Sequence, residues 1–544
     1  MTQTLTIIDW LVIFTYLFGL IAFAIWLSRR QESREDYYVG GRKIGAWPVA
    51  LSVMATQCST NSILGAPAFV AFTLGGGLVW LQYELAVPLA MIVLILFVMP
   101  LFRHLQLVSV YAYLEQRFDL KTRLTLSGLF LFVRAFATAV TVYSIAIVIN
   151  LITGLGFFWS VVLLGVFTVV YDVFGGIRGV IYSDVIQLLI LVAVLGILLF
   201  LLLADSGGLV TLLNNFDASR RMSLDFRHHG LGDGQTFAFW PMLFGGLFLY
   251  VSYYGCDQSQ AQRLLSTRNI DTTNKALLIN GLLRFPLVFL YCLVGVGIGV
   301  YAINHPEFIA ALPTSDNKPE YNLAVPLYML STLPIGMVGL GLVALFAAAM
   351  SSLDSVINSL SATTMEDFVR RFHRGNWTRR KELNYSRIIT AIWGCITLAM
   401  AFYVDDIATT VLEAINKIGS LANGPILAVF ALGMLTKRVH GTGAVTALLC
   451  GILFNGYCWL ALPTVSWLWW NVGGFIVAYG IGIGLSFVSY SASTQRDYMA
   501  HLNPETLETR IQFFLATESS INWYKCSAVL AVWFCLLLTL LWLL

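Results

Sequence analysis

Fourteen apolar stretches follow one another along the chain, each close to or above the roughly 20 residues that a membrane-spanning helix needs. Polar and charged residues gather in the segments between them. This pattern predicts an all-α polytopic membrane protein, and two of the stretches are too long for one straight span, so we expect breaks or extensions in them. The predicted spans lie near residues 9–28, 46–73, 78–102, 124–152, 157–176, 181–203, 236–262, 276–303, 324–368, 386–403, 407–434, 441–462, 467–490 and 523–543.

The stretch 346–361 places seven polar side chains in the middle of a predicted span. A charged side chain at that depth costs about 2.5–3.5 kcal/mol, so such residues usually mark a site. On a helical wheel of about 100° per residue, one arc of roughly 100° is shared by Ala348, Ser351, Ser352, Ser355 and Ser359. Hydroxyls and exposed carbonyls on a face of small residues suit a hard cation such as Na⁺. Close helix packing is the alternative explanation, and the carboxylate of Asp354 argues against it.

Two other spans carry polar runs with residues that interrupt helices. The run 55–67 ends in Gly65 and Pro67, and the run 250–263 contains Gly255. Carbonyls exposed at such depth persist only where they are buried in protein or line a cavity. A proline kink with Ser and Thr side chains bonded to the backbone is the alternative for 55–67. Two interrupted helices at corresponding positions of two five-helix halves indicate a transporter built from an inverted repeat.

Composition agrees with a membrane protein, since 58% of the residues are hydrophobic and only 11% are charged, against about 25% in soluble proteins. Most of the 32 Lys and Arg residues fall on alternate loops. By the positive-inside rule these loops are cytoplasmic, which places both termini outside. The basic loops are thus topology signals, and we expect no nucleic-acid partner and no obligate protein partner. The predicted location is a membrane, in particular a bacterial inner membrane.

The eight cysteines all fall in predicted spans and show no disulfide or metal spacing. The first apolar stretch lacks a basic leading segment and a small-residue cleavage site, so we expect it to be a retained helix. The segment 491–521 is mostly polar and is predicted to form a short surface helix.

Several separated motifs resemble the sodium:solute symporter family. They are DYYVGGR at 36–42, YDVFGGIRGVIYSDVIQ at 171–187, QSQAQR at 258–263, AAAMSS at 347–352 and GPILAVF at 424–430. The family includes Na⁺-coupled sugar, proline, sialic acid, iodide, monocarboxylate and vitamin transporters, and the similarity covers roughly 9–490. It implies a LeuT-type core of ten helices, with a first repeat at 46–203, a second at 236–434, one extra helix at 9–28 and further helices at 441–544, all in a single transporter domain.

The resemblance also implies ion sites. The common sodium site of the family maps onto Ala55, Cys58, Ala348, Ser351 and Ser352. A second sodium site, present in some members, maps onto Asp184, Asp354 and Ser355. Asp354 departs from the Ser, Thr or Ala usual in the family, so the second site is either strengthened by charge or changed in ion. From the residues alone, the alternative is that Ser183 and Asp184 cap a helix near the cytoplasmic face.

Substrate positions of the family map onto Thr60, Ser62, Gln82, Glu84, Tyr253, Arg284 and Asn416, with Tyr253 as a candidate inner gate. The third core helix departs from the family pattern, because Ala137 replaces the polar substrate residue and Arg134 lies one turn away. Arginines within a membrane usually face a partner or a cavity. Arg134 and Arg284 could clamp a substrate carboxylate through two parallel hydrogen bonds. Alternatively, either could neutralise Glu84. Both interpretations stay open, and because one of them places an arginine at the substrate, an anionic substrate is slightly favoured.

We therefore expect a secondary active transporter, and not an enzyme, that imports a small polar organic solute with Na⁺ by alternating access. Na⁺ is the coupling ion and no organic cofactor is needed. A Na⁺-coupled sugar or amino-acid symporter is the alternative substrate class. An ion channel or a transporter-like membrane sensor is the alternative from other classes, although no repeated pore motif is visible.

Overall fold

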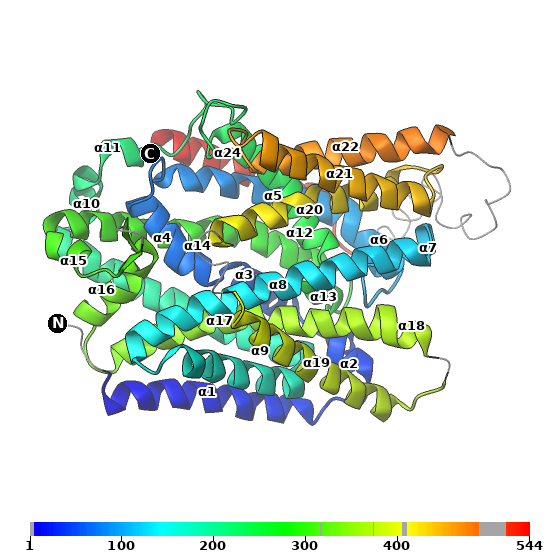
Figure 1. Ribbon diagram of the computed structural model, residues 1–544, viewed down its shortest axis with the longest axis horizontal. Helices are drawn as coiled ribbons and strands as arrows, with labels where there is room; N and C mark the ends of the chain where they lie inside the picture. Colours follow the sequence, from blue (N-terminus) through cyan, green and yellow to red (C-terminus); the bar gives the residue numbers. More distant parts are fainter. Residues whose placement is uncertain (1–4, 316–317, 374, 405–410, 489–517) are drawn as a thin grey trace.

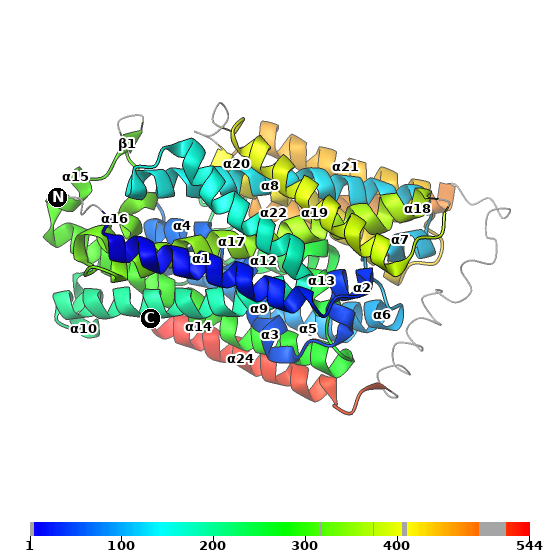
Figure 2. The same ribbon diagram turned by 90° about the horizontal axis from the view of Figure 1, so that it is seen from below.

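Helices that run mainly along the long axis make up the computed structural model (Figure 1). It describes the chain except residues 1–4, 316–317, 374, 405–410 and 489–517. Helix α1 (Ile7–Ser28) lies along one edge in Figure 1, and α21 (Gly441–Ala461), α22 (Leu468–Val488) and α24 (Trp523–Leu543) lie along the opposite edge. The view in Figure 2 separates α24 from α21, so these C-terminal helices cover different sides of the bundle.

The first half of the core begins with α2 (Arg34–Val39) and η1 (Gly40–Arg42), which lead into a helix in two pieces. The pieces are α3 (Ala46–Gln57) and α4 (Thr60–Ala71). The predicted break in this span is therefore present. The remaining elements of this half are η2 (Leu78–Leu85), α5 (Ala86–Val93), η3 (Leu94–Val98), α6 (Met99–His104), α7 (Ala112–Arg117), α8 (Leu120–Thr153) and α9 (Phe157–Ser206).

Short elements connect the halves, namely α10 (Leu209–Asn215) and α11 (Ala218–Arg221). The second half opens with η4 (Pro241–Gly245) and then a second helix in two pieces, α12 (Gly246–Cys256) and α13 (Gln258–Leu265). The later elements are α14 (Ile270–Asn304), α15 (Pro306–Ala310), the hairpin strands β1 (Thr314–Ser315) and β2 (Lys318–Pro319), η5 (Tyr321–Leu323), α16 (Ala324–Thr332), α17 (Met337–Thr363), η6 (Thr364–Val369), α18 (Arg370–Phe372), α19 (Arg379–Ala401) and α20 (Val411–Leu435).

Helix α9 covers both predicted spans 157–176 and 181–203, because no polar loop separates them. Instead the chain bends at Gly176, whose φ of +53° lies in the left-handed region that favours glycine. A Cβ at this position would lie 2.8 Å from the backbone oxygen of Tyr37. Glycine is therefore required both for the bend and for the close approach of α2.

The described residues contain nine helices that are long and apolar enough to cross a membrane. The sequence predicts fourteen spans. The two broken helices fall below the required length, α9 counts once for two spans, α19 is not among the nine, and α20 contributes only the shorter apolar helix Gly419–Leu435. The segment 491–521 lies largely outside the described residues. Helix α17 lies at the centre of the bundle, where it packs against α9, α8, α1 and α3. The polar residues of α17 can therefore meet groups from these surrounding helices.

Candidate ion and substrate site

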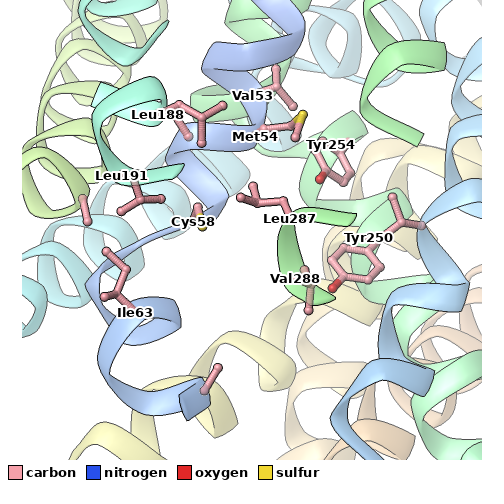
Figure 3. Packing of buried hydrophobic residues seen from close by; sticks show 14 of the residues in the cluster. Val53, Met54, Cys58, Ile63, Leu188, Leu191, Tyr250, Tyr254, Leu287 and Val288 are labelled. Atoms are coloured by element: carbon pink, nitrogen blue, oxygen red, sulfur yellow. The ribbon is translucent and has the colours of Figure 1, made fainter. Parts of the chain in front are cut away.

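The break between α3 and α4 is an extended connection at Cys58 and Ser59. Figure 3 shows Cys58 at this connection, with Leu188 and Leu191 of α9 on one side and Leu287 of α14 on the other. Cys58 is buried. A break at this depth leaves the last carbonyls of α3 without helical donors, so they are free to serve as ligands.

Two serines of α17 point at those carbonyls. Ser351 Oγ lies 3.4 Å from the carbonyl oxygen of Ala55 and 3.2 Å from that of Ala348. Ser352 Oγ lies 3.2 Å from the carbonyl oxygen of Thr56 and 3.4 Å from that of Ala348. The structure therefore brings together four of the five residues assigned to the first sodium site, with Cys58 following directly in the broken connection.

The chemistry of this site fits Na⁺, because the converging groups are neutral hydroxyl and carbonyl oxygens that a hard cation prefers. Thr56 belongs to the same group, since its hydroxyl lies 3.2 Å from Ser355 Oγ and 3.4 Å from the carbonyl oxygen of Ser351. Thr56 is not among the ligands expected from the sequence. Its position in the polar run, one residue after Ala55, was the feature of the sequence that could have marked it as a ligand.

Asp184 of α9 lies in a buried network next to this site. Its Oδ2 accepts a hydrogen bond from Ser52 at 2.6 Å and faces Arg263 at 3.3 Å. Arg263 also donates to Ser52 at 2.7 Å and contacts Ser355 Oγ. Asp184 and Arg263 are both fully buried. The guanidinium therefore lies between the carboxylate and hydroxyl assigned to the second sodium site.

Asp354 completes this network from α17. It accepts a hydrogen bond from the Tyr171 hydroxyl and another from Ser355 Oγ at 3.0 Å. Ser355 Oγ also lies 2.5 Å from the carbonyl oxygen of Ser351, so the two predicted sodium sites share a connected set of oxygens. Asp184 does not cap a helix, because it lies in the interior of α9.

The second break lies at Asp257, between α12 and α13. Asp257 accepts hydrogen bonds from the backbone nitrogen and the hydroxyl of Ser259, and in this way Asp257 caps the start of α13. Arg134 of α8 binds the same carboxylate, with Nε 2.6 Å from Oδ2. The Arg134 guanidinium also lies 5.1 Å from the ring centre of Tyr253, at a distance typical of cation–π contacts.

Glu84 and Arg284 form a separate buried ion pair, with Nε 3.1 Å from Oε2. Their side chains are 1% and 4% exposed, and Tyr250 adds a hydrogen bond to Glu84 Oε1 at 3.2 Å. In this structure Arg284 meets Glu84, one of the two partners expected from the sequence. Arg134 meets Asp257, a partner that the sequence did not indicate.

The remaining predicted substrate residues are more scattered. Gln82 binds the connecting segment, with its amide nitrogen 2.8 Å from the carbonyl oxygen of Phe237 and its oxygen 3.1 Å from the backbone nitrogen of Asp225. Ser62 bridges the first break, because its hydroxyl lies 3.4 Å from the carbonyl oxygen of Gln57. The side chains of Thr60 and Asn416 lie outside the described residues.

Tyr253, the expected inner gate, is half-buried, and its hydroxyl accepts a hydrogen bond from Gln260 at 2.8 Å. Its neighbour Tyr254 reaches the first broken helix through a hydrogen bond to Gln57. The two broken helices are therefore connected by side chains close to the predicted gate.

A bundle with two broken central helices, each presenting backbone and polar groups to the interior, defines a secondary transporter of the inverted-repeat type. The model of the sodium:solute symporter family matches residues 37–451. The chain belongs to this family and is a Na⁺-coupled symporter.

Several characterised proteins are similar to the chain. The sodium/sialic acid symporter NanT of Aliivibrio fischeri is 30% identical over 455 residues, which cover 83% of this chain and 87% of that protein. The human sodium-coupled monocarboxylate transporter 1 is 29% identical over 429 residues, with coverage of 78% and 68%.

A solved structure supports the fold. A Na⁺-coupled sialic acid symporter in a substrate-bound, outward-open state superimposes with a TM-score of 0.79 at 24% identity, covering 89% of this chain and 98% of that one. This similarity establishes the predicted LeuT-type fold.

Proposed function

We propose that this symporter imports a small organic solute that carries a carboxylate, and that the oxygens of Ala55, Cys58, Ala348, Ser351 and Ser352 hold the coupling Na⁺. The observation that carries the ion assignment is the approach of Ser351 and Ser352 to carbonyls of the broken α3. A Na⁺ bound there ties α17 to α3, and its release frees the two helices to move apart.

The second ion site is part of the same proposal. Arg263 contacts Asp184 and Ser355, and Ser355 binds Asp354, so a second Na⁺ would share this network with the guanidinium. Asp354 and Ser355 are adjacent on α17, one turn from Ser351. An ion bound at one site therefore changes ion binding at the other through shared hydrogen bonds.

The carboxylate preference rests on Arg134. Both arginines pair with a carboxylate, Arg284 with Glu84 and Arg134 with Asp257, but the Arg134 side chain is 23% exposed and sits at the break of α12 and α13. A guanidinium fork matches a carboxylate in two parallel hydrogen bonds. The named relatives act on sialic acid and on monocarboxylates, and both classes carry this group.

Energetically, one Na⁺ supports strong accumulation of a neutral solute, but only about tenfold accumulation of a singly charged anion, because the anion's charge cancels the electrical term. Moving one charge gains about 2.3 kcal/mol per 100 mV, and a tenfold Na⁺ gradient adds about 1.4 kcal/mol. Together these support roughly 500-fold accumulation of a neutral solute, and less for an anion that carries its own charge inward.

The charge distribution supports one orientation in the membrane. The two ends of the described chain lie towards one end of the long axis, and α2 and the basic α18 lie towards the other (Figures 1 and 2). This supports an arrangement with both termini outside and the α18 end in the cytoplasm. We place the protein in a bacterial inner membrane. We assign it no enzymatic activity and no obligate protein partner.

The deciding experiment is uptake by the purified protein in proteoliposomes. We expect accumulation of radiolabelled sialic acid or a short monocarboxylate with an inward Na⁺ gradient, and none with K⁺ in its place. Sugars and neutral amino acids serve as the comparison, since a sugar or amino-acid symporter is the second candidate function. Transport of neutral solutes alone would refute the carboxylate preference, and uptake independent of Na⁺ would refute the assignment of the ion.

A further inference from the structure

Asp172 of α9 is a fully buried carboxylate that the proposed ion and substrate sites do not use. Its Oδ1 accepts a hydrogen bond from Asn358 at 3.2 Å. Its Oδ2 is buried and has no hydrogen-bond donor among the described residues. A buried acceptor without a donor is costly, and for a carboxylate oxygen the cost is especially high.

A second unpartnered acceptor lies on the other side of Asn358. The amide nitrogen of Gln262 donates to Asn358 Oδ1 at 2.9 Å and to the carbonyl oxygen of Tyr38 at 2.7 Å. Gln262 Oε1 is buried and, within the described part of the chain, also lacks a donor. Asn358 therefore joins two residues that each present a bare oxygen, which is the ligand type of a hard cation.

The charges around Asp172 favour a cation over an anion. Asp354, Asp184 and the arginine Arg263 interact with it electrostatically. Helix α2 faces Asp172 with two neutral tyrosines, Tyr37 and Tyr38, and the Tyr37 hydroxyl donates to the backbone oxygen of Asp172 at 3.3 Å. Three carboxylates thus share one guanidinium, and the local field attracts positive ions.

The position of Asn358 connects this cluster to the proposed sodium sites. Ser351, Ser355 and Asn358 are spaced by four and three residues on α17, so they lie on one face of the helix. At a rise of about 1.5 Å per residue, Asn358 lies about 10 Å from Ser351 along the axis. The displacement is towards the end of the bundle that holds α2 and α18 (Figure 1).

We propose that Asp172, Gln262 and Asn358 form an inner cation site, which receives Na⁺ from the Asp184 and Asp354 network during its release to the cytoplasm. The proposal rests on the proposed function, in particular on inward Na⁺ symport with the α18 end in the cytoplasm. Occupation of the inner site from the cytoplasm opposes release, so internal Na⁺ inhibits uptake through this site.

The test measures how uptake depends on Na⁺ on each side of proteoliposomes with uniformly oriented protein. Asp172→Asn removes the charge but preserves the shape and the contact with Asn358. We expect the internal Na⁺ concentration for half inhibition to rise tenfold or more. The external Na⁺ concentration for half-maximal uptake should stay within twofold. Gln262→Glu adds a carboxylate to the same site, so it should lower the internal value several-fold.

Tyr37→Phe is the matched control, because it removes a hydrogen bond to the backbone of Asp172 and leaves the carboxylate in place. Its internal Na⁺ concentration for half inhibition should equal that of the wild type. An unchanged internal value in Asp172→Asn, or inhibition by internal acid instead of internal Na⁺, would overturn the proposal. If Asp172→Asn does not fold, Gln262→Glu decides, and an unchanged or raised internal value then refutes the site. Wild-type uptake that ignores external Na⁺ would instead refute the proposed function.

Discussion

Ser351 and Ser352 are the residues whose roles are easiest to measure. Replacing both with Ala removes two hydroxyl ligands from the proposed first sodium site while keeping the backbone carbonyls of Ala55 and Ala348. We expect the Na⁺ concentration for half-maximal uptake to rise tenfold or more, which corresponds to about 1.4 kcal/mol. The measurement is uptake against external Na⁺, with surface expression of the variant as its control. A well-expressed variant with an unchanged Na⁺ dependence would exclude these ligands.

The two intramembrane arginines are expected to differ in their effects. Arg134→Lys should weaken a carboxylate substrate at least tenfold, because an ammonium cannot reproduce the two-pronged contact of a guanidinium. Arg284→Lys should change substrate affinity little, because that side chain is enclosed with Glu84. Competition uptake with unlabelled substrate measures both. Equal effects of the two substitutions would show that the enclosed pair also shapes the substrate site.

The Glu84 and Arg284 pair should matter mainly for stability. Truncating one member of a buried ion pair leaves the other charge unpaired, which typically costs about 3–5 kcal/mol. We expect Arg284→Met to lower the unfolding temperature strongly in detergent. The double variant with Glu84→Gln should recover part of the loss, because no uncompensated charge remains. If the double variant lost as much stability as the two single variants combined, the coupling between Glu84 and Arg284 would be contradicted.

At the scale of elements, the bend of α9 depends on Gly176. Alanine would be strained at a φ of +53°, and its Cβ would collide with the backbone of Tyr37. We expect Gly176→Ala to displace α2 and to reduce both folded yield and transport. Gly179→Ala on the same helix is the control, since a Cβ there meets no atom within 4 Å. Folded yield by size-exclusion chromatography compares them, and equal yields would contradict the requirement for the bend.

Both broken helices were predictable from the sequence because breaks need local signals. Polar runs interrupt both apolar stretches, and the structure confirms a break in each span. The residues expected to interrupt the helices do not lie at the breaks, because Gly65 and Pro67 lie inside α4 and Gly255 lies inside α12. The exact position of the second break at Asp257 was less evident. Its carboxylate is stabilised by Arg134, which is 123 residues distant in sequence, and no local pattern reveals such a pairing.

The same limit explains what the sequence analysis missed in the site. The serines of α17 share a helical face, so periodicity found them. Ser52, Arg263 and Asp172 matter through contacts between α3, α9, α13 and α17 that only the tertiary fold creates. Arg263 stood in a motif that indicated the family, yet nothing near it in the sequence pointed to Asp184.

At the scale of the whole molecule, Na⁺ should stabilise the folded protein because its proposed ligands come from separate helices. A ligand present at a hundred times its Kd adds about 2.7 kcal/mol to the free energy of unfolding. We expect a higher unfolding temperature in NaCl than in KCl at equal ionic strength. The difference should shrink in the variant with Ser351→Ala and Ser352→Ala. An equal shift in that variant would place the stabilising ion elsewhere.

The place of Ser351 near the middle of α17 has an electrical consequence. The residue lies fourteen positions after Met337 and twelve before Thr363, the ends of that helix, so an ion reaching it from outside crosses about half of the membrane. Half of the roughly 2.3 kcal/mol per charge at 100 mV is about 1.2 kcal/mol, which is close to a sevenfold change in apparent affinity. For the proposed site and orientation, we therefore expect the membrane potential to raise the occupancy of the site by Na⁺. We expect a cell that loses its potential to lose transport through weaker ion binding before its Na⁺ gradient has run down.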